Sequence, residues 1–161
     1  MHGLFSDNAK VETSKVVKDI LWLYNIYDLQ SEPHHQHQNP AERHIQEVKA
    51  STNVVMDRTG APSFMWLLCM LYVVYILNVL SHSTLDRTTP IQAAFGITPD
   101  ISIILCFQFY QKVLYKDPSG TLPGGSEKSG RFVGFAENIG DALTFRIWTD
   151  DTQELIVRSE V

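Results

Sequence analysis

Hydrophobic residues near the start of the chain recur with two different periods. In segment 11–24 they fall at steps of three and four, the spacing that places side chains on one face of a helix: Val16, Val17, Ile20, Leu21 and Tyr24. Residues 3–6 are predicted to be the end of a strand, and the alternation of Tyr27 and Leu29 predicts another short strand.

Segment 31–39 is polar and contains Pro33 and three histidines, which predicts a loop. A helix is expected to follow, because Pro40 suits a first helical turn and Asn39 a cap. Its residues separate into two stripes. The expected inward stripe is Ala41, Ile45, Val48, Thr52 and Val55, and the expected polar stripe is Glu42, Gln46, Lys49 and Asn53.

The longest apolar run covers residues 64–80 and is interrupted only by Asn78. A membrane-spanning helix needs about 20 apolar residues, slightly more than this run provides. Pro62 and Ser63 precede the run and are typical of the start of a helix in a soluble protein. We therefore expect a helix packed in a core and no membrane partner, with a membrane span as the alternative.

After Gly96 the helical spacing gives way to short aromatic and alternating runs separated by turn residues. Strands are predicted at residues 113–115, 131–135, 143–148 and 155–157, with a hairpin turn at 150–153. Several short strands with close turns predict a small barrel. A domain boundary is expected at 97–100, which divides the chain into residues 1–97 and 100–161.

Composition sets wider limits. The 161 residues are 44% hydrophobic and 19% charged, which is typical of a globular chain. Cys69 and Cys106 both lie in apolar surroundings, which favours buried thiols over a disulfide. The net charge of −5 argues against DNA binding by bulk electrostatics, since phosphates are usually contacted by Lys and Arg.

Five segments carry a resemblance to a known family. They are SDNAK at residues 6–10, SEPHHQHQNPAER at 31–43, TPIQAAFGITP at 89–99, and the pair GRFVGF and FRIWTDDT at 130–135 and 145–152. In this order they resemble the integrase of copia-type LTR retrotransposons, which is a retroviral-type integrase, followed by the small barrel of the Pol polyprotein.

The resemblance implies the chemistry of the site. In that family an Asp ends a strand, a helix and a strand follow, and a Glu on the next helix returns to share divalent metal. Asp7 and Glu42 occupy these two positions, which makes them the expected catalytic and metal-binding residues. Carboxylate oxygens suit Mg²⁺ or Mn²⁺, which stabilise the attacking and leaving oxygens in phosphodiester chemistry.

The resemblance also implies DNA contacts. In such integrases, residues one and two turns after the catalytic Glu touch the DNA end, and these positions are Gln46 and Lys49 here. His37 and Asn39 belong to a loop that lies near the DNA in the family. The alternative for the Gln46 and Lys49 face is an ordinary solvated helix surface.

The implied fold is α/β, a partial ribonuclease H-like core with helices dominant, followed by a small all-β Src-homology-type barrel. The implied partners are DNA, both retroelement ends and target, and further copies of the chain. The implied localisation is the nucleus and the cytoplasm, in a retroelement particle.

One departure from the family matters. The family uses three acids, and the first lies on a strand far upstream of the second, whereas only six residues precede Asp7. We therefore expect a truncated chain that is inactive alone. The alternative function is a non-catalytic module that binds nucleic acid or assists polyprotein assembly.

Two further groups of residues admit two interpretations. His34, His35 and His37 resemble zinc ligands, but no second cluster supplies a fourth partner, so a polar loop is favoured. The aromatic residues of the predicted barrel suit either base stacking or a core, and the core is favoured; they are Phe132, Phe135, Phe145 and Trp148. Arg131 and Arg146 are the candidate nucleic-acid contacts of this part.

Overall fold

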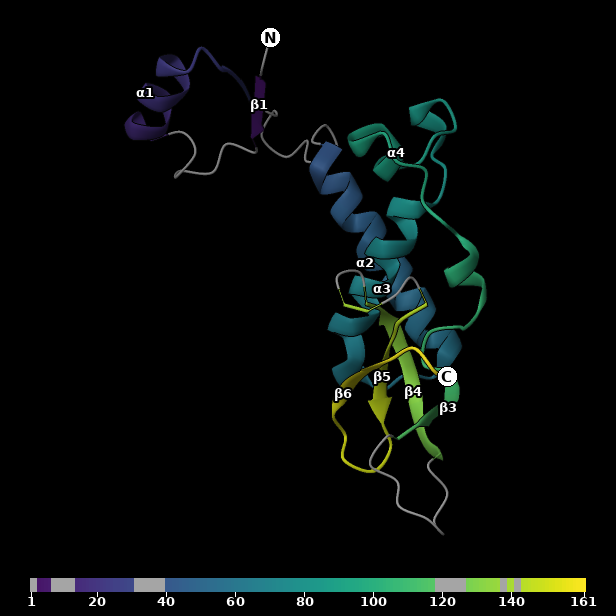
Figure 1. Cartoon of the computed structure of the whole chain (residues 1–161). Helices are drawn as coiled ribbons and strands as arrows, with labels where there is room; N and C mark the ends of the chain where they lie inside the picture. The colour runs from purple at the N-terminus through teal and green to yellow at the C-terminus, as the bar shows by residue number, and fades with distance from the viewer. Residues whose placement is uncertain (1–2, 7–13, 31–39, 118–126, 137–138, 141–142) are drawn as a thin grey trace. The chain divides into compact units, whose positions relative to one another are not determined.

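Two compact units make up the computed structural model of the chain, Met1–Glu47 and Val48–Val161 (Figure 1). Each is described separately. The described residues are 3–6, 14–30, 40–117, 127–136, 139–140 and 143–161.

The first unit contains two parallel strands joined through a helix. Strand β1 (Gly3–Ser6) pairs with β2 (Tyr27–Gln30), and helix α1 (Lys15–Leu23) lies between them in the sequence. The Ser14 side chain caps α1 by accepting a hydrogen bond from the backbone N–H of Val17 at 3.5 Å. The strand, helix and strand predicted from the sequence are confirmed.

Helix α2 (Pro40–Thr59) begins at the predicted proline. The predicted inward stripe is only partly buried: Thr52 is buried and Val55 packs in the core, whereas Ala41 is exposed and Ile45 is 48% exposed. The hydroxyl of Thr52 donates to the Val48 carbonyl at 2.7 Å, which satisfies this buried polar group.

The second unit continues with short 3-10 turns and two more helices. Turn η2 (Ser63–Met65) leads directly into α3 (Trp66–Val79), and η3 (Ser83–Leu85) precedes α4 (Pro90–Phe95). The Thr89 hydroxyl caps α4 by accepting from the backbone N–H of Gln92 at 3.1 Å, and Gly96 ends the helix with a φ of 71°. The helix predicted at the Thr-Pro motif is confirmed.

A four-stranded antiparallel sheet follows η4 (Ser102–Leu105). Its strands, in sheet order, are β3 (Lys112–Lys116), β4 (Glu127–Phe135), β5 (Phe145–Thr149) and β6 (Leu155–Arg158). The register shifts between Phe132 and Gly134, where a β-bulge bends β4. At one end of the sheet the backbone N–H of Lys116, the last residue of β3, donates to the carbonyl of Glu160, which follows β6, at 3.4 Å. All four predicted strands are confirmed.

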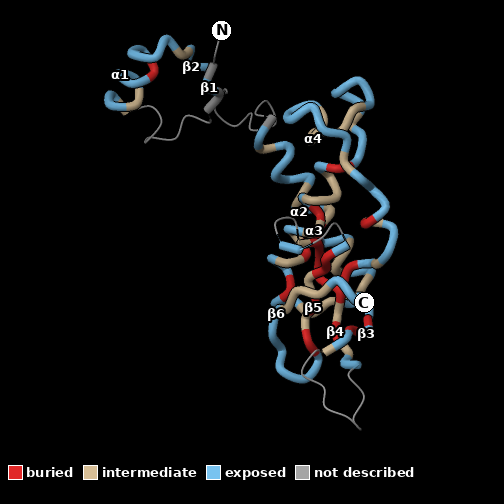
Figure 2. The backbone as a smooth tube through the Cα atoms, in the orientation of Figure 1, coloured by how far each residue is buried: buried red, intermediate tan, exposed pale blue. Residues whose placement is uncertain are grey.

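Two hydrophobic clusters form the core of this unit. Figure 2 colours the buried positions along its backbone red. The first lies within the sheet and includes Phe132, Phe135 and Phe145, which are at most 5% exposed. The second joins α3 to β4 through Met65, Cys69, Val73, Phe109 and Val133. The three buried phenylalanines are therefore core residues and not a base-stacking platform, and Trp148 packs beside the second cluster.

Helix α3 packs on the sheet through aromatic contacts within the second unit. Tyr72 of α3 lies 5.7 Å from the ring of Phe135 and 6.1 Å from that of Phe132, measured between ring centroids. These contacts place residues 48–97 and the sheet in one compact unit. The two compact units are defined by contacts within the structure, whereas the predicted domains are expected evolutionary and folding units. The domains at residues 1–97 and 100–161 therefore stay a prediction.

The segment Ser63–Leu85 is long and apolar enough to cross a membrane by length and composition, and 22% of its most apolar window is buried in the structure. One face of α3 is occupied by protein, since Cys69, Val73 and Val79 are at most 4% exposed. A core helix of a soluble protein is mostly buried, whereas burial here is confined to this face, so the helix packed in a core and the absence of a membrane partner stay predictions.

Candidate metal and nucleic-acid site

Glu42 lies in the first turn of α2, where the helix dipole favours a negative charge. Its side chain is half-buried, and its Oε1 accepts a hydrogen bond from Gln46 Nε2 at 3.2 Å. This bond uses one carboxylate oxygen and leaves the second for another partner. Carboxylate oxygen is the donor that Mg²⁺ prefers, so Glu42 fits such an ion in chemical kind.

Gln46 and Lys49 continue the polar stripe that Glu42 starts. Both side chains are exposed, at one and two turns beyond Glu42 along the same helix. The hydrogen bond from Gln46 to Glu42 shows that the first two members lie on one face. The stripe therefore offers a carboxylate, an amide and an ammonium group in a row, as the sequence predicts.

The remaining predicted site residues lie outside the described residues. Asp7 follows the last residue of β1 in the sequence, and Asn39 precedes the first residue of α2. His34, His35 and His37 also fall outside. Within the part of the chain that the structure describes, no group of three His, Cys, Asp or Glu side chains is arranged to hold a metal ion.

The two cysteines differ from each other. Cys69 is buried, as expected, and burial raises the pKa of its thiol to about 11. Cys106 is exposed, so the expectation of a buried thiol is wrong at this position. The reason is that Cys106 follows the short turn η4, which places its apolar neighbour Leu105 on the surface as well, 80% exposed. Neither cysteine forms a disulfide.

Arg131 is already engaged by its own unit. Its guanidinium lies 5.1 Å from the centroid of the Tyr110 ring, and its Nε lies 3.8 Å from Asp150 Oδ1. Arg146 instead lines a cavity beside α3. Arg131 would therefore have to leave Tyr110 and Asp150 before it could contact a phosphate.

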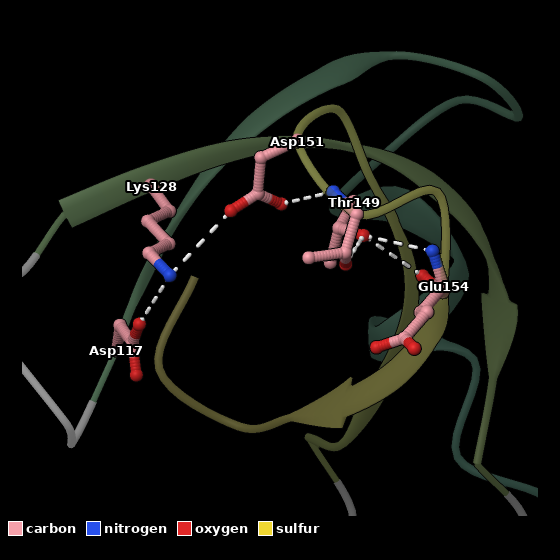
Figure 3. A network of polar contacts seen from close by, with 6 residues as sticks. Asp117, Lys128, Thr149, Asp151 and Glu154 are labelled. Atoms are coloured by element: carbon pink, nitrogen blue, oxygen red, sulfur yellow. Dashed lines mark hydrogen bonds and ion pairs between the residues drawn. The ribbon is translucent and has the colours of Figure 1, made fainter.

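A polar network that the sequence does not reveal joins β3, β4 and the turn after β5 (Figure 3). Lys128 Nζ lies 2.6 Å from Asp117 Oδ2 and 3.5 Å from Asp151 Oδ2. The hydrogen bond to Asp117, and then its charge, raises the pKa of Lys128. The backbone N–H of Thr152 donates to Asp151 and lowers the pKa of that carboxyl.

The same turn is held from its other side by Thr149 (Figure 3). Its hydroxyl donates to the Glu154 carbonyl at 3.2 Å and accepts from the Glu154 N–H at 2.9 Å. The Asp117 and Asp151 carboxylates face a lysine of their own sheet, so this network stabilises the sheet and does not form a metal site.

No protein-family model matches the chain, and no curated protein matches it significantly.

Proposed function

We propose that the chain is part of a copia-type retrotransposon integrase. The order of elements around the two acids carries this proposal. Asp7 follows β1, α1 leads to the parallel strand β2, and Glu42 stands in the first turn of α2. This order is the one that the resembled family uses to bring its second and third acids together.

In this proposal Asp7 and Glu42 are metal ligands. When bound, Mg²⁺ or Mn²⁺ would stabilise the attacking and leaving oxygens during end processing and strand transfer. Glu42 would supply its free carboxylate oxygen, while the bond from Gln46 holds the other. Gln46 and Lys49 would contact the DNA from the exposed stripe of α2, with Lys49 neutralising a phosphate. His37 and Asn39 would add contacts from the preceding segment.

The finer fold is part of the same proposal. Strands β1 and β2 with α1, α2 and α3 would belong to a ribonuclease H-like core, and β3 to β6 would form a Src-homology-type barrel. The bond from the Lys116 N–H to the Glu160 carbonyl supports the barrel, because it links the edge strand β3 to the residues that follow the other edge strand, β6.

Two carboxylates hold a metal pair less well than three. We therefore expect the 161 residues by themselves to bind Mn²⁺ weakly and to catalyse no strand transfer. A non-catalytic nucleic-acid-binding module is the second candidate, favoured by the exposure of Gln46 and Lys49, which need no metal to meet a DNA backbone. The net charge of −5 limits such binding.

Paramagnetic line broadening tests the metal proposal. Added Mn²⁺ should broaden the amide signals of the first turns of α2, and both Asp7→Asn and Glu42→Gln should reduce the broadening. Glu47→Gln is the matched control, because Glu47 lies on the same helix but pairs with His44 at 3.5 Å. Equal broadening in all four proteins would contradict the proposal.

DNA binding separates the two candidates. Fluorescence anisotropy with labelled duplex is measured in Mn²⁺ and in EDTA. Salt-dependent binding that survives EDTA and the double variant Asp7→Asn with Glu42→Gln would favour the non-catalytic module. Binding that requires both the metal and the two acids would favour the integrase.

A further inference from the structure

Arg146 of β5 carries a charge that its own unit does not neutralise. The other arginines of the sheet are engaged: Arg131 lies beside Asp150, and Arg158 donates to the Val157 carbonyl at 2.9 Å. Arg146 is partly buried, and within the described part of the chain its guanidinium forms no ion pair. A partly buried charge without a counter-charge is costly, so a group from outside the chain can stabilise it.

A hollow of about 350 Å³ lies beside Arg146 and is called the Arg146 hollow below. Gly134 of β4 lies directly across from Arg146 and also lines this space. A Cβ at Gly134 would meet nothing within 4 Å, so the missing side chain leaves room next to Arg146. Among the described residues, no Asp or Glu lines the hollow.

The other polar residues of the Arg146 hollow carry hydrogen-bond donors. They are Tyr72, Tyr75 and Asn78 of α3. Burial raises the pKa of Tyr72, so its hydroxyl keeps its proton at neutral pH and can donate. The guanidinium of Arg146 adds a planar fork of N–H groups that matches the two oxygens of a carboxylate. One positive charge among neutral donors suits a ligand with one negative charge.

The remaining wall of the hollow is apolar and limits what this ligand is. It consists of Leu68, Leu71, Val74, Val133 and Phe135. The volume is near the lower end of small-molecule sites, which begin at about 300 Å³. The ligand is therefore small and has an apolar body next to its charged group. A nucleic-acid backbone fits less well, because each phosphate is followed closely by further charges.

We propose that the Arg146 hollow binds a small organic carboxylate with an aromatic or branched aliphatic body. The carboxylate pairs with the guanidinium of Arg146, and Tyr72 and Asn78 donate to its remaining lone pairs. The apolar body lies between α3 and β4, in the space that Gly134 leaves open. Binding then neutralises the charge of Arg146 and removes apolar surface from water at the same time.

This site is independent of the proposed function. It requires neither Asp7 nor Glu42, and it is measured in EDTA without nucleic acid. Failure of the metal experiment above would leave it standing, and the reverse also holds.

Titration of the full chain with phenylpropionate tests the proposal by nitrogen–proton correlation NMR. Phenylpropionate should shift the side-chain Nε–H signal of Arg146 and the backbone amide signal of Gly134. Phenylpropionamide has nearly the same shape without the charge, so it should bind about tenfold more weakly or less.

Removal of the charge gives the first variant. Arg146→Gln keeps a polar side chain but removes the guanidinium, so phenylpropionate should bind about tenfold more weakly, and no better than phenylpropionamide. The matched control is Lys112→Gln, which changes the net charge equally at an exposed position of β3 outside the hollow. It should leave the binding of both compounds unchanged.

Filling the hollow gives a second variant that leaves Arg146 in place. Val74 lines the hollow and is 37% exposed, so Val74→Phe should be tolerated by the fold and should abolish binding of both compounds. Leu67→Phe is the control, because Leu67 is an exposed residue of the same helix that does not line the hollow.

Three results would overturn the proposal. Equal affinity for phenylpropionate and phenylpropionamide would mean that the charge of Arg146 recognises nothing. Absence of shifts at Arg146 and Gly134 at millimolar phenylpropionate would mean that the hollow is not a carboxylate site. Displacement of phenylpropionate by micromolar duplex DNA would show that Arg146 contacts a phosphate of nucleic acid instead.

Discussion

The thiol of Cys69 donates a hydrogen bond to the backbone carbonyl of Thr52, with 3.7 Å between Sγ and the oxygen. The bond joins α3 to α2 at the point where both residues are buried. Val55, Met56 and Met65 surround it in the second cluster. Cys69 thus behaves as a small apolar residue with one polar contact, which accounts for its complete burial.

This burial predicts unequal reactivity of the two cysteines. With its pKa raised to about 11, the Cys69 thiol is protonated at pH 8 and lies out of reach of a reagent. A thiol-specific chromogenic reagent should therefore titrate one thiol per native chain and two in guanidinium. The native signal should disappear in Cys106→Ser and persist in Cys69→Ala. Rapid reaction of two thiols in the native chain would contradict the buried position.

Alkaline pH should weaken the fold through the same residue. A raised pKa means that the folded chain holds the thiol proton more tightly than the unfolded chain does. The contribution of Cys69 to stability is therefore complete below pH 9.0 and is lost as the pH rises toward about 11. Urea unfolding across this range should show a smaller decline in the free energy of unfolding for Cys69→Ala than for the native chain.

Phe132 is the centre of the sheet core. It is 0% exposed and contacts the rings of Phe107, Phe135 and Phe145 at centroid distances of 5.2 to 5.8 Å. Phe132→Ala should lower the free energy of unfolding by about 3–5 kcal/mol. The control is Phe95→Ala, since Phe95 is 73% exposed and should cost far less. Equal losses in chemical denaturation would show that Phe132 is not central.

Gly130 is required by the close approach of β5. A Cβ at this position would lie 2.5 Å from Ile147 Cγ2 and 2.7 Å from the Trp148 carbonyl oxygen. The second atom is backbone and cannot turn away, so Gly130→Ala should separate β4 from β5. We expect a loss of about 1–3 kcal/mol in the free energy of unfolding, typical of overpacking. Lys112→Ala, at an exposed position of β3, should have little effect.

The elements of this fold are readable from the sequence where a local rule decides them. Pro40 and Pro90 start helices because their missing N–H is not needed there, and Gly96 ends α4 because it accepts a positive φ. The burial of α2 was predicted less well. A helical stripe shows which residues could be covered, but Ile45 is covered only if another element reaches it, and spacing alone does not contain that information.

Some contacts of the polar residues could also be predicted from the sequence, and others could not. The alignment of Glu42 with Gln46 follows from helical periodicity and was predicted. The pairing of Lys128 with Asp117 and Asp151 was not, because it depends on the register of β3 against β4 and on the turn after β5. No sequence motif marks contacts of that kind. The apolar run at α3 was visible in the sequence, whereas the side that stays exposed emerges only from its packing on the sheet.

The ion pairs of Lys128 give the last prediction. The backbone N–H of Thr152 and, to a lesser extent, Lys128 lower the pKa of Asp151, so the contribution of this carboxyl to stability is present above its ordinary value of 3.8 and is lost in acid. Lys128 has a raised pKa, so its contribution is present below 10.5 and is lost in alkali. Lys128→Met should therefore lower the melting temperature slightly between these limits, and the difference from the native chain should shrink below pH 3.8 and in high salt.

The matched control is Lys112→Met, which removes an exposed lysine with no ion-pair partner among the described residues and should show no such pH dependence. A difference that stays constant across pH and salt would mean that Lys128 acts through the packing of its aliphatic stem and not through its charge.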